Sequence, residues 1–130
     1  MKILAVHHNA IICSNYAQSK DFYVNLLGCT VIHEAYRESR KSYKLDLKLP
    51  GDTATQIELF SFPNPPKRPT EPEACGLRHL AFAVNNVQET AAELENKGIA
   101  VEPLRKDAYT GKLFTFFQDP DGLPLELYEG

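Results

Sequence analysis

Apolar and polar positions alternate in short runs along this chain, and one series of runs occurs twice. Residues 8–13 form an apolar run that opens with a histidine and has an alanine two places on. Residues 79–84 repeat this pattern, at an offset of 71 positions from His8 to His79. Because a repeat of this kind marks a duplicated structural unit, we expect two halves with the same order of elements.

A helix is expected after each of these runs. Segments 16–27 and 87–97 carry apolar residues at the spacing of a helix that packs one side against a sheet. An asparagine precedes each segment as an N-cap, and a glycine follows it where a left-handed backbone can end a helix. These residues are Asn15, Asn86, Gly28 and Gly98.

Three strands are expected after each helix. They cover residues 29–36, 43–49, 55–61, 99–104, 112–118 and 124–129, with turn residues at 51–52 and 119–122. Each half therefore predicts the order β-α-β-β-β. Two such modules predict an α+β fold whose mixed sheets pair as an open, barrel-like trough, because one sheet alone leaves a face uncovered.

A proline-rich segment separates the halves. Five of the nine prolines fall within residues 62–73, and proline cannot donate the amide hydrogen bond that a sheet needs. We predict a single domain, 1–130, with a first module at 1–62, a connector at 63–76 and a second module at 77–130. The connector is a spacer or a lid at a pocket rim.

Composition excludes several classes of function. The net charge of −3 and the lack of a basic face argue against a nucleic-acid partner. No apolar run approaches the roughly 20 residues of a membrane-spanning helix, and the N-terminus lacks signal-peptide features. We therefore expect a cytoplasmic protein with no membrane partner. Cys13, Cys29 and Cys75 are expected to be reduced and mostly buried, since they form no zinc or disulfide motif.

Four side chains with metal-ligand chemistry occupy equivalent places in the two halves. His8 and His79 open the first strands, and Glu58 and Glu126 lie in the last strands within the same Glu-Leu-aromatic phrase. Each alone is more simply structural or exposed. Two buried carboxylates that face each other repel, however, and a divalent cation removes that conflict. Imidazole and carboxylate suit Zn, Ni, Fe, Co or Mn, so the repeat predicts one metal ion held by all four residues.

Two further histidines are interpreted differently. His7 competes with His8, because adjacent strand residues face opposite sides of a sheet. The repeat favours His8, since an arginine, Arg78, stands in the corresponding place before His79. We expect His7 to pack under a helix or cap a backbone group. His33 has no counterpart in the second half and is expected to be structural or exposed.

Taken together, these motifs resemble the vicinal oxygen chelate superfamily, the fold of glyoxalase I and of bleomycin-resistance and dioxygenase proteins. The resemblance covers almost the whole chain, and the region from Glu58 to His79 is similar to a small bacterial glyoxalase-like group. It rests on residues 6–11, 19–23 with 27–28, 77–82, and 119–122 with 125–127.

The resemblance implies a function. Glyoxalase I relatives hold one metal ion, with Ni or Zn favoured, through a His, Glu, His, Glu set that matches His8, Glu58, His79 and Glu126. One glutamate shuttles the substrate proton, and we favour Glu126 over Glu58. The implied activity is that of a metal-dependent lyase or isomerase. Its substrate would be a small α-oxo or α-hydroxy carbonyl compound that reacts through a metal-chelated enediolate.

Other branches of the superfamily supply alternatives. A non-catalytic protein that binds a small molecule is one, although such members lack the metal set. Iron-dependent dioxygenases and fosfomycin-resistance enzymes generally carry no carboxylate at the position of Glu58, which makes a dioxygenase less favoured. Epimerase relatives usually carry glutamine there. Relatives close the trough within one chain or by swapping halves, and we expect a homodimer.

Substrate recognition departs from glutathione-using relatives. Phe62 and Ile12 stand where the short bacterial enzymes carry asparagine and arginine, so two elements of glutathione recognition are missing. Arg37, Lys44 and Lys112 lie on expected strands that could face the trough. Any of them could hold an anionic substrate group, although a solvated surface charge is the simpler interpretation of each.

Overall fold

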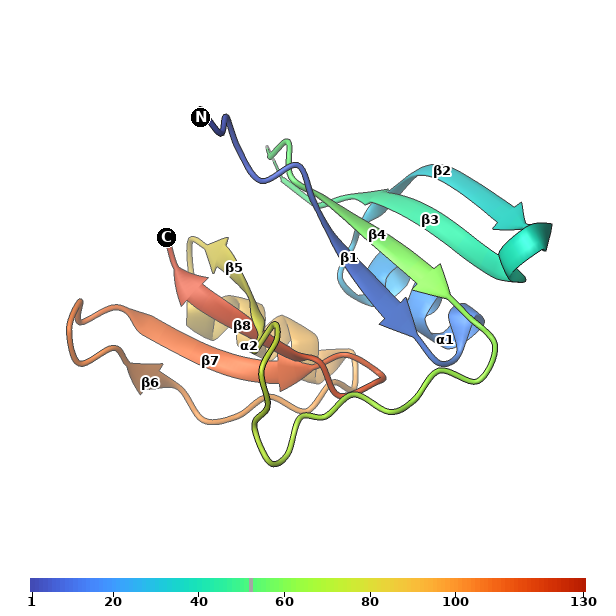
Figure 1. Ribbon diagram of the computed structural model, residues 1–130. Helices are drawn as coiled ribbons and strands as arrows, with labels where there is room; N and C mark the ends of the chain where they lie inside the picture. The colour runs from blue at the N-terminus through green and yellow to red at the C-terminus, as the bar shows by residue number, and fades with distance from the viewer. Residues whose placement is uncertain (52) are drawn as a thin grey trace. The chain divides into compact units, whose positions relative to one another are not determined.

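The structure, a computed structural model, describes residues 1–51 and 53–130 and divides into two compact units (Figure 1). The first unit is Met1–Lys67 and the second is Arg68–Gly130, so the division falls inside the predicted connector. The turn expected at 51–52 lies partly outside the described residues.

The first unit contains a four-stranded mixed sheet and one helix. Its elements are β1 (His8–Cys13), α1 (Tyr16–Asp21), β2 (Thr30–Arg37), β3 (Ser42–Lys48) and β4 (Gln56–Ser61). The strand order is β1-β4-β3-β2, with β1 parallel to β4 and the other pairs antiparallel. A π-helical turn, Phe22–Leu26, continues α1, and a 3-10 turn, Glu38–Arg40, joins β2 to β3.

The second unit repeats this topology. Its elements are β5 (Leu80–Val84), α2 (Val87–Asn96), β6 (Arg105–Lys106), β7 (Leu113–Gln118) and β8 (Pro124–Glu129). The strand order is β5-β8-β7-β6, and β5 is parallel to β8 as β1 is to β4. The predicted β-α-β-β-β order is therefore confirmed in both modules, and the fold is α+β.

The ends of both helices follow the sequence prediction. The side-chain oxygen of Asn15 accepts the backbone N–H of Gln18 at 3.1 Å, and that of Asn86 accepts the N–H of Glu89 at 2.9 Å. The two glycines after the helices have φ angles of 83° and 85°, in the left-handed region that favours glycine. Local chemistry alone thus fixes where each helix begins and where its chain turns back.

One predicted strand is wrong. Residues 99–104 form no strand, and the pairing with β7 is limited to Arg105–Lys106. The N–H of Glu102 does donate to the carbonyl of Phe116 at 2.9 Å. The next residue, Pro103, has no N–H to continue the ladder. The buried hydroxyl of Thr115 also donates to the Glu102 carbonyl at 2.7 Å, so a side chain takes the place of a strand contact.

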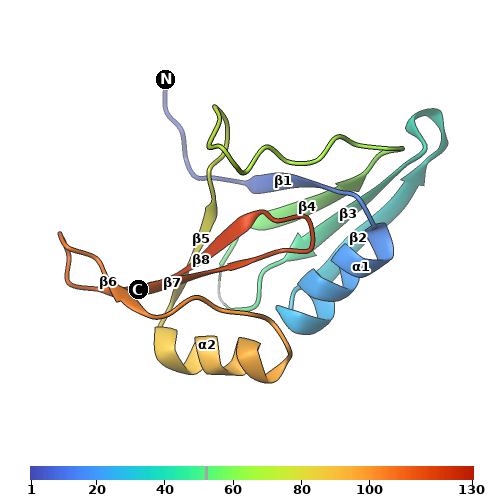
Figure 2. The ribbon, with the colours of Figure 1, turned by 90° about the horizontal axis from the view of Figure 1, so that it is seen from below.

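Each helix covers one face of its own sheet, as the view from below shows (Figure 2). Alternate strand residues point toward the helix and are fully buried, and they include Leu45, Leu47, Ile57, Leu59 and Leu125. Burial of one such leucine stabilises the fold by roughly 1.5–3 kcal/mol. The residues between them lie on the opposite face of each sheet, where the predicted metal ligands are found.

The cysteines and the helices agree with the remaining expectations. Cys13 and Cys29 are buried and Cys75 is exposed. Burial raises the pKa of the Cys29 thiol to about 11. Among the described residues, no helix has the length and apolar character needed to cross a membrane.

Candidate metal centre

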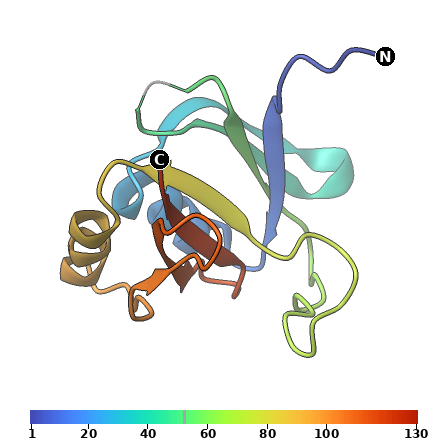
Figure 3. The same cartoon turned by 90° about the vertical axis from the view of Figure 1, so that its left-hand side faces the viewer.

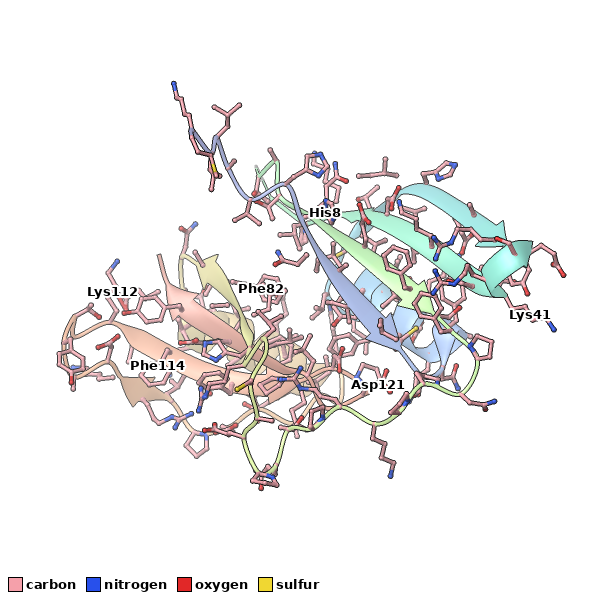
Figure 4. All side chains as sticks on the ribbon, viewed as in Figure 1. His8, Lys41, Phe82, Lys112, Phe114 and Asp121 are labelled. Atoms are coloured by element: carbon pink, nitrogen blue, oxygen red, sulfur yellow. The ribbon has the colours of Figure 1, made fainter. Side chains whose placement is uncertain are left out.

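His8 and Glu58 form a pair on the first sheet. In the parallel register of β1 and β4, Glu58 lies beside Ala10, two residues after the histidine. Because strand residues two apart share a face, both side chains lie on the face opposite α1. The Nδ1 atom of His8 is 3.5 Å from Oε2 of Glu58. His8 stands at the start of β1, where Figure 4 labels it.

His79 and Glu126 form the corresponding pair on the second sheet. Glu126 lies beside Ala81 in the parallel register of β5 and β8, which reproduces the two-residue offset of the first unit. The Nε2 atom of His79 is 2.9 Å from Oε2 of Glu126. A guanidinium N–H of Arg78 lies 3.2 Å from His79 Nδ1. Because arginine can only donate, this contact makes Nδ1 the acceptor, which in a neutral ring leaves the proton on Nε2, the nitrogen nearest Glu126.

The two pairs have different neighbours. On the first sheet, β3 places Asp46 beside Glu58, and Lys44 Nζ lies 2.6 Å from Asp46 and 3.7 Å from Glu58. The hydrogen bond to Asp46, helped by attraction to Glu58, raises the pKa of Lys44. On the second sheet, β7 places Phe116 beside Glu126, and its ring meets that of His79 edge to face at 5.1 Å. One glutamate therefore lies among charges and the other beside an aromatic ring.

The donors in each unit fit a divalent cation but do not complete a site. One imidazole and one carboxylate per unit are donors that Zn, Ni and related metals accept. A catalytic zinc ion, for comparison, takes three protein ligands. Within residues 1–51 and 53–130, no group of three or more histidine, cysteine, aspartate or glutamate side chains is arranged so that it could hold a metal ion. Neither pair suffices alone, and the set of His8, Glu58, His79 and Glu126 stays a prediction.

The prediction for His7 is wrong. His7 is exposed, and its ring stands nearly perpendicular to that of His8, with 5.1 Å between centroids and 2.9 Å between the two Nδ1 atoms. It lies directly before β1, where its carbonyl still accepts the N–H of Gln56 at 2.9 Å, and the first residues of the chain extend beyond the strand (Figure 3). His33 is exposed on β2, as expected.

The three basic residues singled out in the sequence are not equivalent. Arg37 lies at the end of β2, and its guanidinium is 5.1 Å from the centre of the Phe60 ring. Phe60 is on β4, the strand that carries Glu58. Lys44 contacts Glu58 directly. Lys112 lies just before β7, at the end of that strand far from Asp121 (Figure 4). Sequence reasoning missed Asp46, although strict alternation over 45–49 already placed it on the polar face.

A cavity of about 440 Å³ lies within the second unit. Part of the connector forms one wall, including Arg68 and Glu73, and Phe116 and Arg105 form another. Phe116 also contacts His79, so the cavity adjoins the second histidine–glutamate pair. Here the connector is the wall of a pocket and not an inert spacer.

The duplicated βαβββ modules and their matching histidine–glutamate pairs agree with the protein family to which the sequence is similar. A family model for the Glyoxalase/Bleomycin resistance protein/Dioxygenase superfamily covers residues 5–127, and the chain belongs to this superfamily. It is 61% identical over 129 residues to the uncharacterized protein YwkD of Bacillus subtilis (strain 168), covering 99% of both chains. It is 59% identical over 124 residues to the uncharacterized protein YaeR of Escherichia coli (strain K12), covering 95% of both.

A solved structure supports the same family and fold. The crystal structure of the glyoxalase family protein from Enterococcus faecalis is similar with a TM-score of 0.89 and 51% identity, covering 96% of this chain and 97% of that one. These likenesses establish the family and the fold. Because one fold serves many reactions, the activity has to be argued from the site.

Proposed function

We propose that the protein is a metal-dependent lyase or isomerase of the glyoxalase type that acts on a small α-oxo or α-hydroxy carbonyl compound. One observation carries the proposal. The same imidazole–carboxylate pair occurs at the same register, on the face opposite the helix, in both modules. A single such pair is common as a surface contact, but a duplicated pair supplies the four donors that glyoxalase chemistry uses.

We assign one divalent cation to His8, Glu58, His79 and Glu126, with Ni or Zn favoured and Co, Mn or Fe compatible with the donors. When bound, the cation would supply Lewis-acid stabilisation of negative charge on the substrate oxygens. Each unit provides only two donors, so both modules are required. Loss of any one of the four side chains is therefore expected to weaken the whole site.

The two glutamates receive different roles. The side chains of Glu126 and Glu58 are almost equally buried, 11% and 13% exposed, but Glu126 lies beside the apolar ring of Phe116 and Glu58 lies beside charges. A base that exchanges a proton with carbon works best where water is excluded. Its carboxylate, which contacts His79, would take the proton from the substrate carbon and return it. Glu58, 3.7 Å from the Lys44 ammonium, is assigned to hold the cation and not to move the proton.

The experiment begins with the metal content of the purified protein. The protein is then stripped with a chelator, reloaded with Ni, Zn, Co or Mn, and screened against α-oxo aldehydes and α-hydroxy ketones with and without a thiol. We expect turnover to disappear on stripping, to return with at least one metal, and to be lost in Glu126→Gln. Glu95→Gln, which removes an exposed carboxylate on α2, should behave as the parent. Turnover that survives stripping or Glu126→Gln would contradict the proposal.

The cavity in the second unit favours one other function, the non-catalytic binding of a small molecule. Its volume of about 440 Å³ is within the usual range of ligand pockets. This function predicts saturable ligand binding without turnover, unchanged when metal is removed. Comparing ligand binding before and after stripping therefore separates the two functions.

We also propose that the chain assembles as a homodimer. Several apolar side chains before β1 are exposed, namely Met1, Ile3, Leu4 and Val6, and exposed apolar surface is typical of association sites. Light scattering coupled to size-exclusion chromatography should give twice the mass of one chain. A monomer at micromolar concentration would contradict this assembly.

A further inference from the structure

We propose that Arg37 binds an anionic group of the substrate, a carboxylate or a phosphate, so that the substrate is a negatively charged carbonyl compound. The assignment of this ligand as substrate rests on the proposed function. The placement of Arg37 carries the inference. Its guanidinium lies over the ring of Phe60, at 5.1 Å from the centroid. Phe60 is two residues beyond Glu58 on β4 and shares its face, about 7 Å along the strand.

The guanidinium of Arg37 is held in position before any ligand arrives. One terminal nitrogen donates to the hydroxyl of Ser42 at 3.1 Å, and Ser42 is fully buried. The ring of Phe60 supports its flat face. A planar guanidinium fixed on two sides loses little freedom when it pairs with a carboxylate or phosphate, which favours binding.

The charge of Arg37 is not neutralised by the protein. Among the described residues, no carboxylate lies within ion-pair distance of it, and its Nε atom is buried without a hydrogen-bond partner. A buried donor without a partner costs roughly 1–3 kcal/mol. An anion that accepts from Nε would remove this cost, and the neighbouring terminal nitrogens could make a second bond.

The repeat supplies an internal comparison. Arg105, on the corresponding edge strand of the second sheet, also stacks on aromatic rings, at 5.1 Å from Phe114 and 5.5 Å from Phe116. It differs in one respect, since Glu102 pairs with it at 3.1 Å. A stacked arginine on this edge strand is thus a feature of both modules, and of these two arginines Arg37 is the one without an acidic partner among the described residues.

These positions define the class of ligand. The reacting carbons would lie near Glu58, and the anionic group would lie a few bonds away at Arg37. Between them stands a second cation, Lys44, at 3.7 Å from Glu58 and 6.0 Å from the centre of the Phe60 ring. The geometry therefore points to a short carbonyl compound with a carboxylate or phosphate at its far end.

The test follows the Nε–H resonance of Arg37 by NMR in the full-length protein with added Zn²⁺. The probes are inorganic phosphate, 2-oxoglutarate and the 5-methyl ester of 2-oxoglutarate, which lacks the distal charge. We expect saturable movement of this resonance with the first two probes and none with the ester. Calorimetry should show that Arg37→Gln weakens 2-oxoglutarate binding about tenfold or more, the value of one charge-assisted hydrogen bond. Arg37→Lys should recover part of the loss.

The matched control is Arg40→Gln, which removes the same charge from the exposed turn three residues along, where Arg40 stacks on Phe62. It should change binding less than twofold. The proposal is overturned if the Arg37 resonance moves with neither anion. It is also overturned if the ester binds as tightly as the diacid. A loss of binding in Arg40→Gln equal to that in Arg37→Gln would overturn it as well. The anion response of the Arg37 resonance is measured by NMR and calorimetry, without reference to turnover. Absence of turnover would therefore refute the proposed function separately, and intact turnover without an anion response would refute only this inference.

Discussion

Replacement of Glu126 by glutamine distinguishes two roles for this residue, a structural partner of His79 and a ligand of the metal. In the protein without metal, Glu126 is nearly buried and bonded to His79 at 2.9 Å. Glutamine keeps the shape of the side chain, and its amide oxygen can still accept from His79 Nε2. The free energy of unfolding of the metal-free protein should fall by no more than about 1 kcal/mol, the net value of an ordinary hydrogen bond.

The effect on the metal-loaded protein should be larger. At a metal concentration of about 100 Kd, binding stabilises the native state by about 2.7 kcal/mol. Loss of a supporting residue around a metal typically costs 10–100-fold in affinity, so about a hundredfold is a modest expectation for a direct ligand. The stabilisation would then fall to about 0.4 kcal/mol. At about 4 °C per kcal/mol, the metal-induced rise in Tm should shrink by about 9 °C.

The assay is thermal unfolding with and without Ni²⁺ or Zn²⁺, after chelation, for the parent, Glu126→Gln and the surface control Glu95→Gln. The control should keep the full metal-induced shift. If Glu126→Gln keeps it as well, Glu126 is no ligand, and its bond to His79 is only a structural contact. If the parent itself shows no shift with any metal, the four-residue site does not exist.

Three further predictions concern the fold. Leu59→Ala, at a fully buried position on β4, should lower the free energy of unfolding in urea by roughly 2–5 kcal/mol, and a loss under 1 kcal/mol would contradict the packing. Asn86→Ala should cost about 1 kcal/mol in the same assay by removing the α2 cap, whereas an unchanged stability would show that the cap is dispensable. Burial raises the pKa of Cys29 from 9.0 to about 11, so the unfolded chain releases this proton first and stability should fall between pH 9 and 11. Cys29→Ala should remove that part of the fall, and identical pH curves for the two proteins would refute it.

Much of the fold could be predicted because its information is local. Asn15 and Asn86 cap helices through their own side chains, and glycine is favoured wherever the backbone must turn left-handed. The repeat then extended local information to the site, since equivalent places in the two halves paired His8 with Glu58 and His79 with Glu126. A duplicated pattern carries long-range information that a single strand does not.

The failures arose where a long-range contact decided the outcome. Whether residues 99–104 pair as a strand depends on Pro103 and on the hydroxyl of Thr115, which comes from a distant strand. The place of His7 depends on where β1 begins, which sequence periodicity locates only to within a few residues. The stacking of Arg37 on Phe60 joins two strands that are not adjacent in sequence, and composition offers no signal for it.

The predicted metal ligands and the side chains that surround them come from different strands. The histidines and glutamates lie on or next to β1, β4, β5 and β8, whereas their neighbours come from β3 and β7. One strand presents Lys44 and Asp46 where its counterpart presents Phe114 and Phe116. Duplication of a module thus allowed one wall to become charged and the other aromatic without touching the chelating residues. A designer could exchange these two strand faces to change the preferred substrate while leaving the chelating residues in place.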